Sequence, residues 1–264
     1  MSSRIARTAG LIALPAILLL AIGLRVGGAE DVELSGDVNG RRPDGSTPLQ
    51  WAVYEGDAAQ ARRVIEGGTD VTLANDYGAT PMSLAAEVAD TAVLKMLLDA
   101  GADADSPNPE GMTALMAVAR TGNVEAAKLL IEHGATVDAR ENFGGQSALM
   151  WAAARRHPAM IELLLAHGAA IDARSTHPDY QRHITAEGRP KSLDSGGFTP
   201  LLYAARENCR ECVDVLLAKG ADIDLPDPDG VSPLLLAIMN ANWDLAKQLI
   251  DAGANVDQWD IFGE

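Results

Sequence analysis

Apolar side chains recur along the chain in two alternating kinds of short block, each about as long as a short helix. The first kind is rich in alanine and contains pairs such as Ala85-Ala86, Ala152-Ala153 and Ala204-Ala205. The second kind carries adjacent large aliphatic residues, as in Met96–Leu98 and Leu129–Ile131. Small side chains allow one helix to approach another closely, and the aliphatic residues supply an apolar face to bury. The pattern therefore predicts a series of helix pairs.

Both kinds of block have recognisable ends. The alanine-rich blocks open with a hydroxyl residue, then Pro or Ala, then Leu or Met: Thr47-Pro48-Leu49, Thr80-Pro81-Met82, Thr113-Ala114-Leu115, Ser147-Ala148-Leu149, Thr199-Pro200-Leu201 and Ser232-Pro233-Leu234. A hydroxyl oxygen at a helix start accepts a free backbone N–H, and proline fits the first turn. The aliphatic blocks stop at Gly-Ala pairs such as Gly101-Ala102, where glycine supplies a left-handed cap.

Two series of glycines mark the period of this pattern. The first series is Gly45, Gly78, Gly111, Gly145, Gly197, Gly230 and Gly263, and the second is Gly68, Gly101, Gly134, Gly168, Gly220 and Gly253. Within the first series the spacings are 33, 33, 34, 52, 33 and 33 residues. A period near 33 indicates stacked units, none of which buries its apolar face alone.

The repeating unit resembles the ankyrin repeat, in which a β-turn finger precedes two antiparallel helices. The resemblance covers residues 41–264 and implies an all-α ankyrin-repeat solenoid with six complete helix-turn-helix repeats and the start of a seventh. It also implies a non-catalytic scaffold for protein–protein interaction, with a protein partner of unknown identity. The seventh finger, at Trp259–Glu264, leads us to expect that further repeats follow this sequence.

One position departs from the ankyrin pattern in all six repeats. The histidine that usually follows Thr-Pro-Leu is replaced by Gln50, Ser83, Met116, Met150, Leu202 and Leu235. We therefore expect apolar packing to replace the family's histidine hydrogen bonds between repeats at most of these positions.

The N-terminal segment has the composition of a targeting signal. Two arginines precede the apolar run Leu11–Leu24, and small residues follow it up to Ala29. These features are typical of a secretory signal peptide, so we expect residues 1–29 to be removed and residues 30–40 to form a linker. The alternative is an uncleaved anchor, but 14 apolar residues fall short of the roughly 20 that span a bilayer. We expect an exported bacterial-type protein, periplasmic or secreted, with no stable membrane insertion after cleavage.

The chain is strongly acidic, with a formal net charge of −16. Removal of residues 1–29 would take away three arginines and no acid, and leave a net charge of −19. Such a surface repels nucleic acids and anionic lipid headgroups, so we expect no nucleic-acid partner.

The 52-residue spacing places a single insertion in one finger loop, at about residues 174–194. It adds 19 residues and carries more basic than acidic side chains. Long loops are often functional, so the insertion is a candidate to hold an acidic partner or to fold back on its own repeats. The alternative is a tolerated surface insertion, because long loops cost little closure entropy.

The candidate partner-binding residues follow from the surfaces that ankyrin repeats use as a family, namely the fingertips and the inner helices. Aromatic and arginine side chains on such a surface are typical of interface hot spots. The candidates are Tyr77, Phe143 and Phe198 beside the finger glycines, and Glu87, Arg120, Arg155, Arg206 and Glu207 on the exposed turn of the inner helices. Trp51, Trp151 and Tyr203 share one inner-helix position, where packing between repeats is the alternative to binding.

Cys209 and Cys212 form the chain's one CxxC pair. The repeat register places Cys209 at the start of an outer helix and Cys212 at an inward-facing position. An exported protein allows these two to close a disulfide across one helical turn. A thioredoxin-like redox role is the alternative, although no βαβ pattern surrounds the pair. Two cysteines alone make a poor zinc site.

No other group of residues predicts catalysis, a metal or a cofactor. The acidic stretch Asp222–Asp229 does not fit a calcium loop, because Leu225 and Leu236 stand where that loop needs acids. Two further alternatives to a simple scaffold stay open: a recognition arm of a longer protein with catalytic or other domains, and an array that only spaces other domains.

Overall fold

The computed structural model describes residues 38–176 and 196–258. The expected signal peptide, most of the insertion and the last six residues lie outside these ranges. The secondary structure within them consists of twelve helices and contains no strand, which confirms the predicted all-α solenoid of six helix pairs. The chain from Val38 onward forms one compact unit. Each repeat comprises a finger, an inner helix and an outer helix.

The odd-numbered helices are the inner helices: α1 (Pro48–Glu55), α3 (Pro81–Val88), α5 (Ala114–Thr121), α7 (Ala148–Ala154), α9 (Pro200–Arg206) and α11 (Pro233–Met239). Each begins after the hydroxyl residue that the sequence predicted as its N-cap. In five of the six, the hydroxyl accepts a first-turn backbone N–H; Thr113 before α5 makes no such bond. The predicted helix starts are therefore confirmed.

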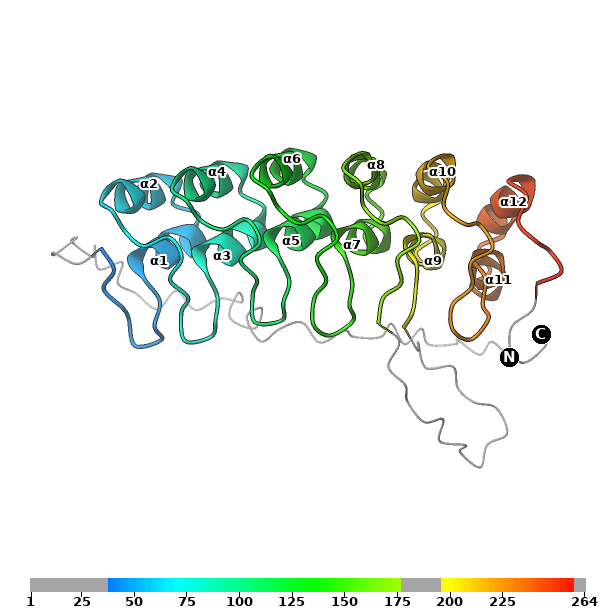
Figure 1. The fold of residues 1–264 in the computed structure, drawn as a ribbon, viewed down its shortest axis with the longest axis horizontal. Helices are drawn as coiled ribbons and strands as arrows, with labels where there is room; N and C mark the ends of the chain where they lie inside the picture. Colours follow the sequence, from blue (N-terminus) through cyan, green and yellow to red (C-terminus); the bar gives the residue numbers. More distant parts are fainter. Residues whose placement is uncertain (1–37, 177–195, 259–264) are drawn as a thin grey trace, which may run out of the picture. The chain divides into compact units, whose positions relative to one another are not determined.

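The even-numbered helices are the outer helices: α2 (Ala58–Glu66), α4 (Thr91–Asp99), α6 (Val124–Glu132), α8 (Pro158–Ala166), α10 (Arg210–Ala218) and α12 (Trp243–Asp251). Figure 1 shows inner helices in one row and outer helices in a second, with the fingers extending from the inner row. Each inner helix packs on its own outer helix and on the inner helices of neighbouring repeats. The apolar core runs continuously between the rows, from Leu49 to Leu249.

The turn between the two helices of each repeat contains one residue with a left-handed backbone. Glycine fills this position at Gly56 and Gly122 (φ 74° and 79°). Other residues stand at the equivalent position elsewhere, and their φ values lie between 50° and 64°: Ala89, Arg156, Asn208 and Ala241. The left-handed region disfavours residues with a Cβ atom, and asparagine tolerates it best, so local backbone strain falls on Ala89, Arg156 and Ala241.

Replacement of Ala89 by glycine is expected to stabilise the protein by about 1 kcal/mol, because the left-handed conformation at the end of α3 costs about that much for alanine. Equilibrium urea denaturation measures the effect. The reverse change, Gly56→Ala, provides the matched control at the equivalent turn and is expected to destabilise by a similar amount. Equal midpoints for Ala89→Gly and the wild type would contradict the argument.

Every finger is closed at its base by the same backbone hydrogen bond. The donor is the N–H of the residue that opens the finger and the acceptor is the carbonyl of the residue that ends it. The pairs are Arg42 with Ser46, Asn75 with Ala79, Asn108 with Met112, Glu141 with Gln146, Ser175 with Phe198, and Asp227 with Val231. The pair Ser175 and Phe198 flanks the insertion, so the added residues enter a finger whose base matches the other five.

Four finger glycines, Gly45, Gly78, Gly111 and Gly145, are required by space as well as by backbone conformation. Gly111 has a φ of 78°, and a Cβ atom added there would lie 2.6 Å from the Asn142 side chain of the next finger. The glycines after the outer helices, such as Gly134, also have positive φ, but a Cβ atom there would meet open space. The two glycine series therefore have different physical causes: close approach between fingers in the first, and helix termination in the second.

A ladder of aspartates joins the turns that follow the outer helices. Each carboxylate accepts the backbone N–H at the start of the next repeat's turn, at 2.8 to 3.1 Å: Asp105 from Thr136, Asp138 from Ala170, Asp172 from Asp222, and Asp224 from Asn255. The third of these bonds spans the insertion. At the N-terminal end, Asn39, within the range expected to be a linker, accepts the N–H of Asp70.

Gln50 retains a polar link between repeats at the position where the family has histidine. Its amide nitrogen donates to the carbonyls of Ala79 (2.6 Å) and Leu73 (3.2 Å) in the next repeat. Met116, Met150 and Leu202 are buried at the equivalent position. At this position, apolar side chains pack in the third, fourth and fifth repeats, while the first repeat keeps hydrogen bonds to the next one.

Candidate protein-binding surface

Two of the three candidate fingertip aromatics are exposed. Tyr77 is 71% exposed and Phe143 is 78% exposed. Both are held by an acceptor side chain at the base of the finger: Asn75 Oδ1 accepts the N–H of Tyr77, and Glu141 Oε2 accepts that of Phe143. Each tip therefore presents an apolar ring on a backbone that is fixed by hydrogen bonds.

Glu141 fixes its finger more extensively than the other anchors do. Its carboxylate accepts the backbone N–H groups of Phe143 (2.6 Å), Gly144 (2.8 Å) and Gln146 (2.9 Å). The side chain is buried among these donors. This finger is one residue longer than the second and third fingers, and the longer carboxylate arm reaches the additional N–H. The sequence reasoning did not identify this residue.

In the first finger, the carboxylate that fixes the backbone by accepting hydrogen bonds is that of Asp44. Its carboxylate accepts the hydroxyl and the backbone N–H of Ser46. These bonds, the hydroxyl first, hold the pKa of Asp44 below its usual range. Because the folded pKa is lowered, the stabilisation is present above the carboxyl's ordinary pKa and is lost as the pH falls through the lowered value.

Phe198 differs from the other two candidates because it is buried, at 6% exposed. Its ring packs edge-on against Tyr203, with ring centres 5.5 Å apart, and the Arg206 guanidinium lies 5.6 Å from the Phe198 ring. Phe198 ends its finger, at the position that the buried Ala79 holds in the second finger, and its carbonyl accepts the N–H of Ser175. Phe198 thus supports the surface from beneath and leaves Arg206 partly exposed.

Four of the five charged candidates on the inner helices form two ion pairs, and the fifth, Arg155, lies apart from them. Arg120 on α5 pairs with Glu87 on α3, which links two repeats. Arg206 and the adjacent Glu207 pair at 3.0 Å. Arg155 lies after α7, where its guanidinium is 6.0 Å from the Trp151 ring.

The aromatic position shared by Trp51, Trp151 and Tyr203 combines packing with cation–π contacts. Arg42 lies 4.1 Å from the Trp51 ring, and Arg206 lies 5.0 Å from the Tyr203 ring. Tyr203 is buried, while the two tryptophans are partly buried. The three rings therefore line the inner-helix row and hold arginine side chains at its surface.

Gln146 connects the fourth finger to the fifth inner helix. Its amide nitrogen donates to the Tyr203 hydroxyl at 2.7 Å. The first repeat has Ser46 at the equivalent position, and Ser46 instead accepts the indole N–H of Trp51. The indole nitrogen of Trp151 is buried without a hydrogen-bond partner. A polar residue five positions before the ring was the available sequence signal, but it did not reveal which neighbour the side chain would bond.

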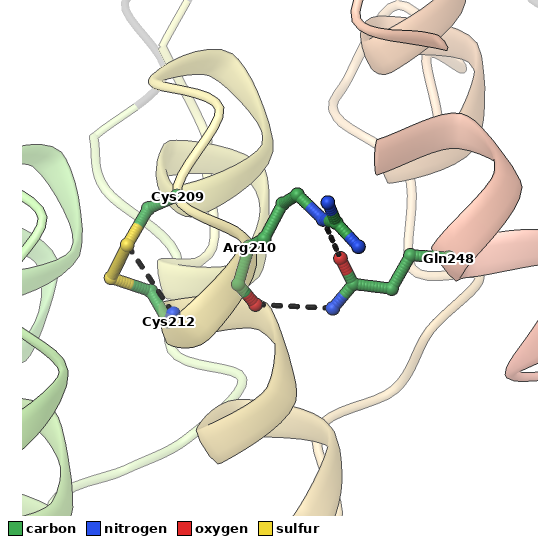
Figure 2. The surroundings of a disulfide bond; sticks show 4 residues. All are labelled: Cys209, Arg210, Cys212 and Gln248. Carbon is green, nitrogen blue, oxygen red and sulfur yellow. Dashed lines mark hydrogen bonds between the residues drawn. A yellow bond between two sulfur atoms is a disulfide. The ribbon is translucent and has the colours of Figure 1, made fainter. Parts of the chain in front are cut away.

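Cys209 and Cys212 are joined by a disulfide at the start of α10 (Figure 2). Cys209 is the N-cap, and its sulfur also accepts the Cys212 N–H at 3.3 Å. Both residues are buried, so an external thiolate lacks access to either sulfur. This environment favours a structural role over thiol exchange.

Arg210, between the two cysteines, is held by Gln248 of α12 through two hydrogen bonds (Figure 2). The guanidinium Nε donates to Gln248 Oε1 at 2.9 Å, and Gln248 Nε2 donates to the Arg210 carbonyl at 3.1 Å. The disulfide-closed turn is thus also a contact point between the fifth and sixth repeats.

Carboxylates in the acidic stretch that begins at Asp222 accept backbone hydrogen bonds that hold turns in place. Asp224 belongs to the aspartate ladder, and Asp227 accepts two backbone N–H groups in the sixth finger. Within residues 38–176 and 196–258, no three potential ligands gather in a way that would hold a metal ion. No helix in these ranges is both long and apolar enough to cross a bilayer.

A family model described as ankyrin repeats (3 copies) matches residues 18–108, 83–175 and 180–260. The human transient receptor potential cation channel subfamily A member 1 is 42% identical over 65 residues, which are 25% of this chain and 6% of that protein. The mouse B-cell lymphoma 3 protein homolog is 42% identical over 62 residues, which are 23% of this chain and 14% of that protein. The chain thus spans a small fraction of these curated relatives.

Among solved structures, the ankyrin repeat domain of Bcl-3 is similar to the chain with a TM-score of 0.68 and 25% identity. The similarity covers 84% of this chain and 92% of that structure. Bcl-3 is described as a unique member of the IkappaB protein family.

Proposed function

Because the chain belongs to the ankyrin-repeat family, a family of protein–protein interaction modules, we propose that it is a non-catalytic scaffold that binds a protein partner in an exported compartment. The observation that carries the proposal is the pair of exposed aromatic rings at Tyr77 and Phe143, each on a hydrogen-bonded finger. A surface that is already ordered costs little conformational entropy when it binds. The role requires no catalytic group.

Two features support the export part of the proposal. The segment before Glu30 has the composition of a secretory signal. The Cys209–Cys212 disulfide is the kind of bond that persists in oxidising compartments. A periplasmic or secreted scaffold combines both features.

Replacement of both fingertip rings is expected to weaken partner binding without unfolding the protein. The double variant Tyr77→Ala/Phe143→Ala should bind a partner captured from the exported fraction at least about tenfold more weakly, because aromatic anchors dominate interface energies. Biolayer interferometry with the purified partner measures the change. Thermal unfolding followed by circular dichroism checks that the fold is retained.

Trp243→Ala provides the matched control, since Trp243 is a 65% exposed aromatic residue on an outer helix, away from the fingertips. Its partner affinity should equal that of the wild type. Unchanged affinity in the fingertip variant would contradict the proposed surface. Recovery of the protein only from the cytoplasm would contradict the proposed compartment.

A further inference from the structure

The turns between inner and outer helices change their charge along the array. The first two turns carry only acidic charges, at Glu55, Asp57, Glu87 and Asp90. The next three carry five arginines: Arg120, Arg155, Arg156, Arg206 and Arg210. We name the turns of repeats 3 to 5, residues 120–123, 155–157 and 206–210, the basic edge. It stands out in a protein with a net charge of −16.

Acidic side chains already occupy part of this edge. Arg120 pairs with Glu87, and Arg206 pairs with Glu207. Arg210 is engaged by Gln248, and Glu125 and Glu211 lie in the first turns of α6 and α10. These contacts reduce the cationic character of the third and fifth turns.

The fourth turn differs because its cations are not neutralised. Arg155 and Arg156 are both exposed, and neither makes an ion pair or a side-chain hydrogen bond within the described parts of the chain. The first turn of α8, which follows directly, contains no acid. His157 extends the polar edge and contacts the Arg120 carbonyl through Nε2 at 3.1 Å. Two adjacent guanidinium groups thus face solvent at the centre of the basic edge.

We infer that the basic edge, centred on Arg155 and Arg156, binds an acidic segment of the protein partner. The inference rests on the proposed scaffold function and adds the chemistry of the bound segment. A guanidinium group presents several N–H donors in a planar fork that fits a carboxylate. Trp151 lies on α7, and the Arg155 guanidinium is 6.0 Å from its ring. The ring supplies an apolar surface beside the charges. A segment rich in Asp and Glu complements both free cations, whereas a basic segment is repelled.

The test measures binding of a fluorescein-labelled 12-residue oligoglutamate to the full chain by fluorescence anisotropy, at 50 and 300 mM salt. We expect saturable binding at low salt that weakens at high salt. Arg155→Glu/Arg156→Glu should weaken it at least about tenfold, because two attractive contacts become repulsive. Arg155→Lys/Arg156→Lys keeps the charges but loses the planar fork, so it should weaken binding less than the glutamate variant does.

The matched control is Arg62→Glu/Lys219→Glu, which makes the same change in net charge at exposed residues of α2 and of the end of α10. It should bind oligoglutamate as the wild type does to within about twofold. An equal loss in both double variants would overturn the inference, since net charge alone would then explain it. Absence of saturable binding by the wild type would also overturn it, as would tighter binding of a 12-nucleotide oligothymidylate.

The inference and the proposed function fail in different ways. A purified partner that binds Arg155→Glu/Arg156→Glu with wild-type affinity, yet loses affinity for Tyr77→Ala/Phe143→Ala, would overturn the acidic-segment inference and support the scaffold. A partner that binds Tyr77→Ala/Phe143→Ala with wild-type affinity would contradict the proposed surface.

Discussion

Replacement of Glu141 by alanine is expected to lower the free energy of unfolding by about 3 kcal/mol, although the residue lies in a finger loop and outside the apolar core. The change removes a buried carboxylate that accepts three backbone N–H groups, at 2.6, 2.8 and 2.9 Å. Those three part-buried donors then lose their acceptor together. Equilibrium urea denaturation measures the loss, and the same variant should bind a partner more weakly because Phe143 is no longer fixed.

Two control variants identify the cause. Glu141→Gln keeps one carbonyl oxygen as an acceptor and should cost about 1 kcal/mol. Glu132→Ala removes an exposed carboxylate at the end of α6 and should leave the denaturation midpoint within the experimental error. A Glu141→Ala variant as stable as the wild type would show that this finger does not depend on its carboxylate.

Loss of the Cys209–Cys212 disulfide is expected to cost about 2 kcal/mol. The bond closes a loop of only four residues, and the chain-entropy relation gives about that value for so short a loop. Cys209→Ser/Cys212→Ala is the appropriate variant, because serine keeps an N-cap oxygen in place of the sulfur that accepts the Cys212 N–H. Urea denaturation followed by circular dichroism measures the change.

Reduced wild-type protein provides the comparison for this variant. After reduction with dithiothreitol in denaturant and refolding with the reductant present, it should have a denaturation midpoint close to that of the variant. The wild type without reductant should be more stable than both. If oxidised and reduced protein unfold at the same urea concentration, the disulfide does not constrain the array.

Local chemistry explains why the sequence predicted the fold well. Hydroxyl residues before Pro or Ala and glycines after aliphatic blocks act within a few residues, so they locate helix ends without any knowledge of tertiary contacts. The helices begin after Thr47, Thr80 and Ser147 as predicted. The period then fixes which helices are neighbours, because each repeat packs only on the repeats beside it.

The candidate surface was harder to predict because exposure depends on contacts between repeats. Tyr77 and Phe198 both adjoin a finger glycine, yet one ring is exposed and the other is packed against Tyr203. The two residues hold different positions in the repeat: Tyr77 precedes its glycine at the fingertip, whereas Phe198 follows Gly197 and is equivalent to the buried Ala79, which ends the second finger. The aspartate ladder was missed for a related reason: its acceptors and donors are about one repeat apart, and each Asp also fits an ordinary turn.

Direct backbone bonds between fingers join the first finger to the second, the third to the fourth, and the fourth to the fifth. The donors are Asp76, Asn142 and Thr176. At the equivalent position the third and sixth fingers have Pro109 and Pro228, which have no N–H to donate. Among residues 38–176 and 196–258, these two prolines interrupt the backbone bonds between fingers, and we expect the mechanical compliance of the finger side to be greatest there. Under a pulling force, the fingers would separate first at these joints, and the block of repeats 3 to 5 would move as one element.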